Sequence, residues 1–96
     1  MEISKEKQGG TLRLKPLGEL DSFTAPELVK AAGDLADVSA LVLDLEKVDY
    51  ISSAGIRVIL SFKKTMEAKG TYTLEHVGPA VREVLDMTGA SEILGI

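Results

Sequence analysis

Hydrophobic and polar residues alternate along the first part of the chain. Residues 2–8, EISKEKQ, are mostly polar, whereas residues 11–17, TLRLKPL, place leucines on one side of a strand and Thr, Arg and Lys on the other. The Gly9-Gly10 pair between them is typical of a β-hairpin. We therefore predict an N-terminal hairpin whose lysine-bearing first strand lies at a sheet edge, with Pro16 at a bulge or an edge.

A helical period follows in residues 24–35. Thr24 and Glu27 have the spacing of a capping box, and Pro26 suits the first turn of a helix. The pattern predicts a helix that begins near Thr24 and ends near Asp37. Its apolar face repeats with the spacing i, i+3, i+4, i+7 and comprises Leu28, Ala31, Ala32 and Leu35.

The second half of the chain alternates strands and helices. The aliphatic run ALVLDL, residues 40–45, predicts a buried central strand, and TYTLEHV, residues 71–77, predicts a further strand. A helix is expected between them, after DYISSAG, with Gly70 as its C′ residue. Another helix is expected from Pro79 to Gly89, and residues 91–96 are expected to add a strand or a turn. The order β-β-α-β-α-β-α implies parallel pairing after the hairpin, so the fold class is α/β with a mixed four- to five-stranded sheet.

Length and composition limit the possible functions. The 96 residues fit a single small domain, and 45% of them are hydrophobic, which is enough for one core. The chain has no cysteine, which excludes thiol catalysis and cysteine-based zinc sites. A net charge of −4 argues against nucleic-acid binding. The polar N-terminus and the absence of a long apolar run lead us to expect a cytoplasmic protein without direct membrane insertion.

Adjacent serines at the junction between a strand and a helix are the most informative feature. Ser53 can simply be an N-cap. It can also be a nucleophile, but Ile51 replaces the first glycine of G-x-S-x-G, and the only histidine, His76, is expected inside a strand. A phosphate-binding loop would need a Gly-x4-Gly-Lys pattern that is absent. The remaining possibility is that Ser53 itself receives a phosphate, which the N-terminus of a helix tolerates.

Three segments together resemble one family. Their order and spacing are similar to those of STAS domains, specifically of bacterial anti-sigma factor antagonists. In chain order the segments are GELDSFTAPEL, LVLDLEKVDYISSAGIRVIL and VREVLDMTGASEIL. The resemblance extends from about Thr11 to Ile96, so we treat residues 1–96 as a single STAS domain. It implies helices packed mainly on one face of the sheet. It also implies a binding protein rather than an enzyme, with no cofactor and no metal.

The resemblance further implies a switch. Such proteins bind an anti-sigma factor with serine kinase activity when they are unphosphorylated, which frees a sigma factor, and a serine phosphatase resets them. Ser53 matches the phosphorylated position, with Ser52 as the alternative, because many family members carry Asp where this chain has Ser52. The expected partner-binding surface comprises Asp21, Ser22, Thr24, Ser52, Ser53, Ala54, Gly55 and Arg57.

Several alternatives remain open at this stage. The same fold could serve as a constitutive subunit of a lipid ABC transporter or of a signalling assembly, or the chain could bind a nucleotide or a small ligand. Arg57 opposes the macrodipole of its helix, which suggests a salt bridge, a partner contact or a contact with a phosphate on Ser53. Asp44 could be a buried carboxylate with a raised pKa or could accept hydrogen bonds from nearby backbone amides. We interpret Glu19 and Asp21 as part of a solvated turn rather than as metal ligands.

Overall fold

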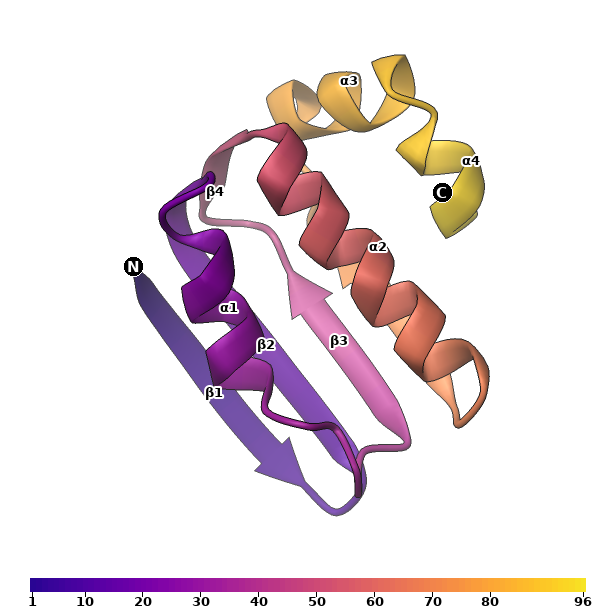
Figure 1. The fold of residues 1–96 in the computed structure, drawn as a ribbon. Helices are drawn as coiled ribbons and strands as arrows, with labels where there is room; N and C mark the ends of the chain where they lie inside the picture. Colours follow the sequence, from indigo (N-terminus) through magenta and orange to yellow (C-terminus); the bar gives the residue numbers. More distant parts are fainter.

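The computed structural model describes residues 1–96 as five strands and four helices (Figure 1). In chain order the elements are β1 (Glu2–Gln8), β2 (Thr11–Leu20), α1 (Ala25–Ala32), β3 (Ala40–Asp44), β4 (Val48–Ile51), α2 (Ser53–Glu67), β5 (Thr71–Glu75), α3 (Pro79–Met87) and α4 (Ala90–Leu94). The predicted α/β class and the N-terminal hairpin are confirmed, and Gly9 turns that hairpin with a φ of 59°.

The sheet is mixed, with the strand order β1-β2-β3-β5. β1 is antiparallel to β2 and forms an edge, while β2, β3 and β5 are parallel. β2 changes partner along its length: Thr11–Leu14 pairs with β3, and Gly18–Leu20 pairs with the short strand β4. Pro16 lies between these two stretches, where only β1 is paired with β2. A residue without an N–H is therefore tolerated in a strand that is otherwise central.

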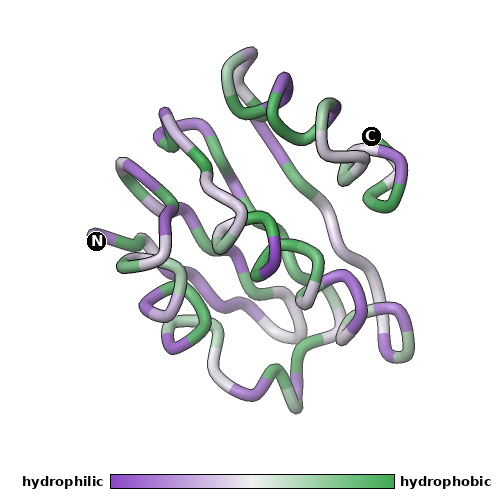
Figure 2. The backbone as a smooth tube through the Cα atoms, turned by 45° about the horizontal axis from the view of Figure 1, so that its top comes forward, coloured by the Kyte–Doolittle hydropathy of each residue, from purple (hydrophilic) through white to green (hydrophobic).

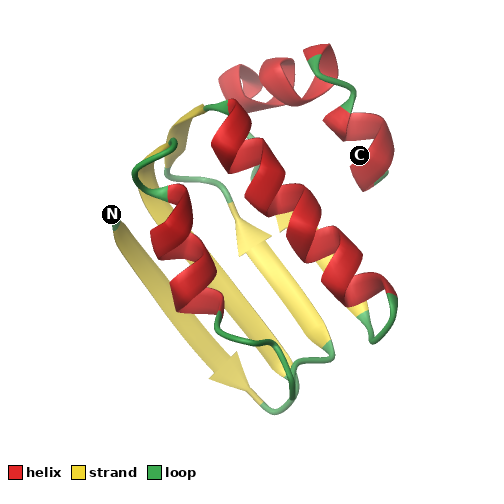
Figure 3. Cartoon of the chain, in the orientation of Figure 1, coloured by secondary structure: helices red, strands yellow, loops and turns green.

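The helices α1 and α2 cover one face of the sheet (Figures 1 and 3). α3 packs against β4, and α4 packs against α2. The opposite face carries polar strand residues, including Arg13 and Lys15, which are partly exposed, and Thr73, which is exposed. The expectation that helices lie mainly on one face is therefore confirmed.

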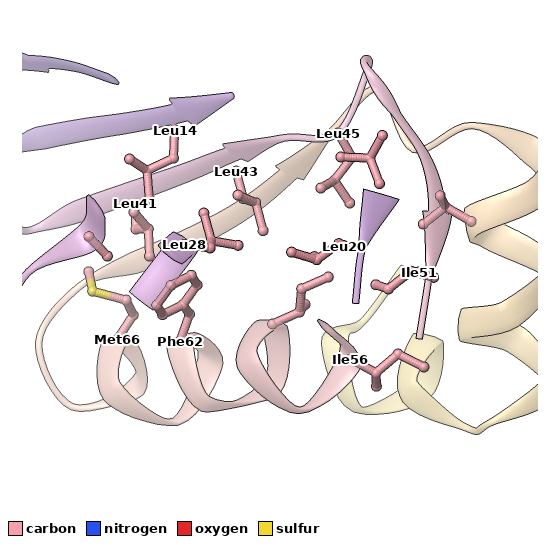
Figure 4. Packing of buried hydrophobic residues seen from close by; sticks show 14 of the residues in the cluster. Leu14, Leu20, Leu28, Leu41, Leu43, Leu45, Ile51, Ile56, Phe62 and Met66 are labelled. Carbon is pink, nitrogen blue, oxygen red and sulfur yellow. The ribbon is translucent and has the colours of Figure 1, made fainter. Parts of the chain in front are cut away.

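The core forms where the leucines of the strands meet the helices. Leu14, Leu41 and Leu43 point from the sheet toward Phe62 and Met66 of α2 (Figure 4). Burying one such side chain stabilises the fold by about 1.5–3 kcal/mol relative to leaving it exposed. This core fixes α2 on the sheet and so determines where its N-terminus lies.

Several predicted boundaries are wrong. α1 ends at Ala32 because Gly33 takes a φ of 70°, and Leu35 lies outside the helix although it is buried. The C-terminal segment forms α4 rather than a strand or a turn. Gly70 is one residue beyond C′, and its φ is not positive. A glycine is needed there because a Cβ would overlap the carbonyl oxygen of Ser39.

Hydrophobic and hydrophilic residues follow one another in short stretches along the whole chain (Figure 2). None of the four helices combines the length and apolar character that a membrane span requires.

Candidate functional site

The candidate site lies where β2 and β4 end side by side. Leu20 and Ile51, the last residues of these parallel strands, are paired in register, and the N–H of Ser52 donates to the carbonyl oxygen of Leu20 at 2.9 Å. The loop between β2 and α1 and the start of α2 therefore leave the sheet next to each other (Figure 1). The topology brings together two of the segments that the sequence pattern identified.

The two serines differ in their accessibility. Ser53 is the first residue of α2 and is exposed, whereas Ser52 occupies the N-cap position. Ser53 as the N-cap, one of the alternatives considered for it, is therefore wrong by one residue. Ser52 does not act as a side-chain cap, and its Oγ is buried without a hydrogen-bond partner. The hydroxyl that another protein can reach is that of Ser53.

The start of α2 favours negative charge. The first backbone hydrogen bond of this helix runs from the N–H of Ile56 to the oxygen of Ser52 at 3.0 Å. The N–H groups of Ser53, Ala54 and Gly55 therefore have no backbone acceptor, as is usual at the N-terminus of a helix. An anion on Ser53 would lie at the positive end of the macrodipole of α2.

The loop between β2 and α1 is held by its own side chains. Asp21 Oδ1 accepts hydrogen bonds from the N–H groups of Thr24 and Phe23, at 3.0 and 2.9 Å. These bonds hold the pKa of Asp21 below its usual value. Thr24 Oγ1 accepts from the N–H of Asp21 and donates to the oxygen of Glu19, so the predicted capping box with Glu27 does not form. Asp21 and Thr24 shape this loop and leave Ser22 and Phe23 exposed.

An apolar groove of about 430 Å³ separates α1 from α2 beside the serines. Arg57 is the only charged residue in its lining and is exposed. Arg57 forms no ion pair, so the salt bridge considered for it is absent. The full lining is Ser22, Ala25, Pro26, Val29, Ala54, Arg57, Val58 and Ser61.

Gly55 does not belong to this surface, although it was predicted to. It is buried and lies against β2 and β4. A Cβ at this position would lie 2.7 Å from the carbonyl oxygen of Leu20 and 2.9 Å from Cγ1 of Ile51. Gly55 therefore allows α2 to approach the sheet closely and so positions Ser53.

Two exposed aromatic residues near the serines were missed by the sequence reasoning. Phe23, in the loop after β2, is 85% exposed, and Tyr50, next to the end of β4, is 52% exposed. The chain has only four aromatic residues, and the other two, Phe62 and Tyr72, contact each other edge to face with ring centroids 6.3 Å apart. The sequence feature that could have predicted their exposure is that both lie among polar neighbours, Phe23 in GELDSFTAPEL and Tyr50 in VDYISS.

A separate polar cluster occupies the open face of the sheet. Asp44 is buried, and its Oδ1 lies 2.9 Å from Nδ1 of His76, while Oδ2 accepts from Arg13 at 3.2 Å. Burial alone would raise the pKa of Asp44, but hydrogen bonds from His76 and from the N–H of Glu46 lower it. The raised pKa considered for Asp44 is therefore wrong, whereas its hydrogen bond to a backbone amide is confirmed.

The same cluster contains the one group of possible metal ligands. Asp44, Glu46 and His76 have ligand atoms within 4.8 Å of one another. Arg13 and Lys15 already pair with Asp44 and Glu46, the latter at 2.8 Å. His76 lies just beyond β5 with a φ of 54°, and not inside the strand as predicted. Arg13 of β2 pairs with Asp44 of β3 and with Glu75 of β5, so the arrangement is a network of ion pairs that links three strands.

Comparison with known proteins assigns the chain to a family. The STAS domain model matches residues 2–96. The chain is 33% identical over its whole length to a putative anti-sigma factor antagonist, BtrV, of Bordetella bronchiseptica, of which it covers 85%. The protein therefore belongs to the STAS domain family.

Solved structures support the same assignment. The chain is 27% identical to an anti-sigma factor antagonist from Mycobacterium paratuberculosis, with a TM-score of 0.83 over 95% of this chain and 80% of that one. The phosphorylated form of the Bacillus cell fate determinant SpoIIAA shares the fold, with a TM-score of 0.74, 22% identity, and coverage of 98% of this chain and 86% of that one.

Proposed function

We propose that this protein is an anti-sigma factor antagonist whose partner is an anti-sigma factor with serine kinase activity. Unphosphorylated, it binds that partner through the surface around Ser53; phosphorylated on Ser53, it is released, and a serine phosphatase restores it. The observation that carries the proposal is the exposed Ser53 at the start of α2, next to Ala54, which lines the apolar groove together with Ser22 of the loop after β2. The relatives whose names describe anti-sigma factor antagonists supply the class of partner.

Exposed aromatic residues support a protein partner. Phe23 and Tyr50 lie on the two segments that meet at the end of β2 and β4. Aromatic side chains bury much area at little entropic cost and are enriched among residues that dominate binding energies. Ser22, which precedes Phe23, lines the groove with Ala54, whereas Tyr50 borders a separate depression with Glu19 and Asp49. We therefore assign Phe23 and Tyr50 as anchors of the partner interface, on the two segments that flank the end of β2 and β4.

Ser53 is also the better acceptor of a phosphate. Its Oγ would attack the γ-phosphorus of ATP held by the kinase, lose its proton to a base of that enzyme and displace ADP. Hydrolysis by the phosphatase would return the serine and inorganic phosphate. Ser52 is a poorer acceptor because its Oγ is buried. The free N–H groups at the start of α2 accommodate the added charge without unfolding the helix.

The phosphate acts on the interface rather than on the fold. It adds about −1.5 to −2 charges to a surface that must lose water when the partner docks. Burying an uncompensated charge or placing like charges together costs several kcal/mol. A cost of about 3–4 kcal/mol weakens binding by two to three orders of magnitude, which is enough to release a partner.

The test is calorimetric titration of the wild-type protein and of Ser53→Asp with each serine-kinase anti-sigma factor encoded in the same genome. We expect one of these factors to bind the wild type and to bind Ser53→Asp at least about a hundredfold more weakly. Ser4→Asp, which adds a carboxylate on the exposed strand β1, is the matched control and should bind as the wild type does. Equal binding of Ser53→Asp and wild type would contradict the switch and favour a constitutive STAS subunit.

A further inference from the structure

We propose that Arg57 is the internal counterion of phosphoserine 53. On phosphorylation its guanidinium would leave the groove between α1 and α2 and pair with the phosphate. This inference rests on the proposed function, because it concerns how phosphorylation at Ser53 changes the surface. The geometry of α2 carries it, together with the charge distribution around the groove.

The spacing on the helix places the two residues together. Ser53 and Arg57 are both exposed and lie four positions apart in α2. Side chains at i and i+4 are neighbours on a helix surface, and a long side chain leans toward the N-terminus over the preceding turn. The guanidinium of Arg57 can therefore reach a group attached to Ser53 without a change in the backbone.

Arg57 is free to make this contact. Of the three arginines in the chain, Arg13 pairs with Asp44 and Glu75, and Arg82 pairs with Asp86 at 3.0 Å, whereas Arg57 has no carboxylate partner. An unpaired cation in the first turns of a helix opposes the macrodipole. A dianionic phosphate on Ser53 would remove that local cost, and a guanidinium can bind phosphate oxygens with two N–H groups.

The pairing would change two parts of the surface at once. In the unphosphorylated chain, Arg57 is the only charge that lines the groove, which is otherwise formed by small, apolar or hydroxyl-bearing side chains such as Pro26, Val29 and Val58. Held by the phosphate, the guanidinium would no longer be available to a partner in that groove. Phosphorylation would add negative charge at Ser53 and withdraw positive charge from the groove.

The test needs no partner protein. Phosphoserine is installed at position 53 of the full chain, and the second pKa of the phosphate is followed by ³¹P NMR. We expect this pKa to be about 0.15–0.4 unit lower in the wild type than in Arg57→Gln, because the cation favours the dianion. Lys64→Gln is the matched control: it removes an exposed cation without an ion pair two turns further along α2, and should titrate as the wild type does.

Two further measurements make the result decisive. Arg57→Lys, which keeps the charge, should give a phosphate pKa between those of the wild type and Arg57→Gln. The Nε–H signal of Arg57 should move on phosphorylation in the wild type. Identical phosphate titrations of wild type and Arg57→Gln, with an unmoved Arg57 signal, would overturn the inference. Because the phosphate is installed directly, this result is independent of whether a kinase or an anti-sigma factor acts on Ser53.

Discussion

Gly55→Ala gives a direct test of how the serine-bearing helix is seated on the sheet. Helix propensity alone predicts that this change stabilises the protein by about 0.8–1.0 kcal/mol. The structure predicts the opposite. The new Cβ would lie 2.7 Å from the oxygen and 2.8 Å from Cγ of Leu20, and 2.9 Å from Cγ1 of Ile51. Favourable carbon contacts lie at about 3.5–4.0 Å, so each of these atoms would have to move.

The magnitude follows from which atoms are in the way. The oxygen of Leu20 belongs to the backbone and accepts the N–H of Ser52 at 2.9 Å, so it cannot withdraw without weakening that bond. Overpacking a core costs about 1–3 kcal/mol, and we place this case in the upper part of that range. Subtracting the gain in helix propensity leaves a net loss of about 1–2 kcal/mol in the free energy of unfolding.

The assay is urea unfolding followed by circular dichroism, with Ala54→Gly as the control. Ala54 is the half-buried neighbour of Gly55, and its loss of helix propensity should cost about 0.8–1.0 kcal/mol. The close packing of α2 predicts that both variants are less stable than the wild type. A Gly55→Ala protein as stable as the wild type, or more stable, would refute the steric reasoning.

Three further predictions concern single positions. Gly70→Ala should cost more than Gly55→Ala in the same urea assay, because its Cβ would overlap the backbone oxygen of Ser39; equal or smaller cost would contradict this. Ser52→Ala should change the free energy of unfolding by less than about 0.5 kcal/mol, rather than the usual loss of about 1 kcal/mol, because its hydroxyl caps nothing; a full loss would show that it does cap α2. The hydrogen bond to Asp44 raises the pKa of His76 above 6.5. The pair of His76 and Asp44 therefore adds to the free energy of unfolding below pH 6.5, and this stabilisation is lost as the pH rises through the raised pKa. The stability advantage of wild type over His76→Gln should therefore be larger at about pH 5.5 than at about pH 8.5, and an equal advantage at both would contradict the pairing.

Local patterns were sufficient to predict most of the fold. The Gly9-Gly10 turn, the aliphatic run of β3 and the periodic apolar face of α2 each identify their element without tertiary information. β4 was missed because only its end residues, Val48 and Ile51, are buried, so its four residues show no alternation. Its existence depends on β2 extending past Gly18 and offering a second pairing edge, which no local pattern encodes.

The residues of the candidate site could be predicted from the sequence, but their burial and orientation could not. The family pattern identified Ser53, and the structure adds that its hydroxyl is exposed while that of Ser52 is buried. The residue spacing alone could not show which of the two hydroxyls is accessible, because burial depends on how α2 meets β2. For the same reason Gly55 was assigned to the surface although it faces inward, and the exposed ring of Phe23 was missed.

The central claim is that Ser53 is the residue through which this protein is switched. The most direct measurement is intact-mass and peptide mass spectrometry of the protein isolated from its native cells, with and without stress. We predict one phosphate, mapped to Ser53, whose occupancy changes between the conditions. A protein that carries no phosphate in any condition, or that carries it only at Ser52, would contradict the account.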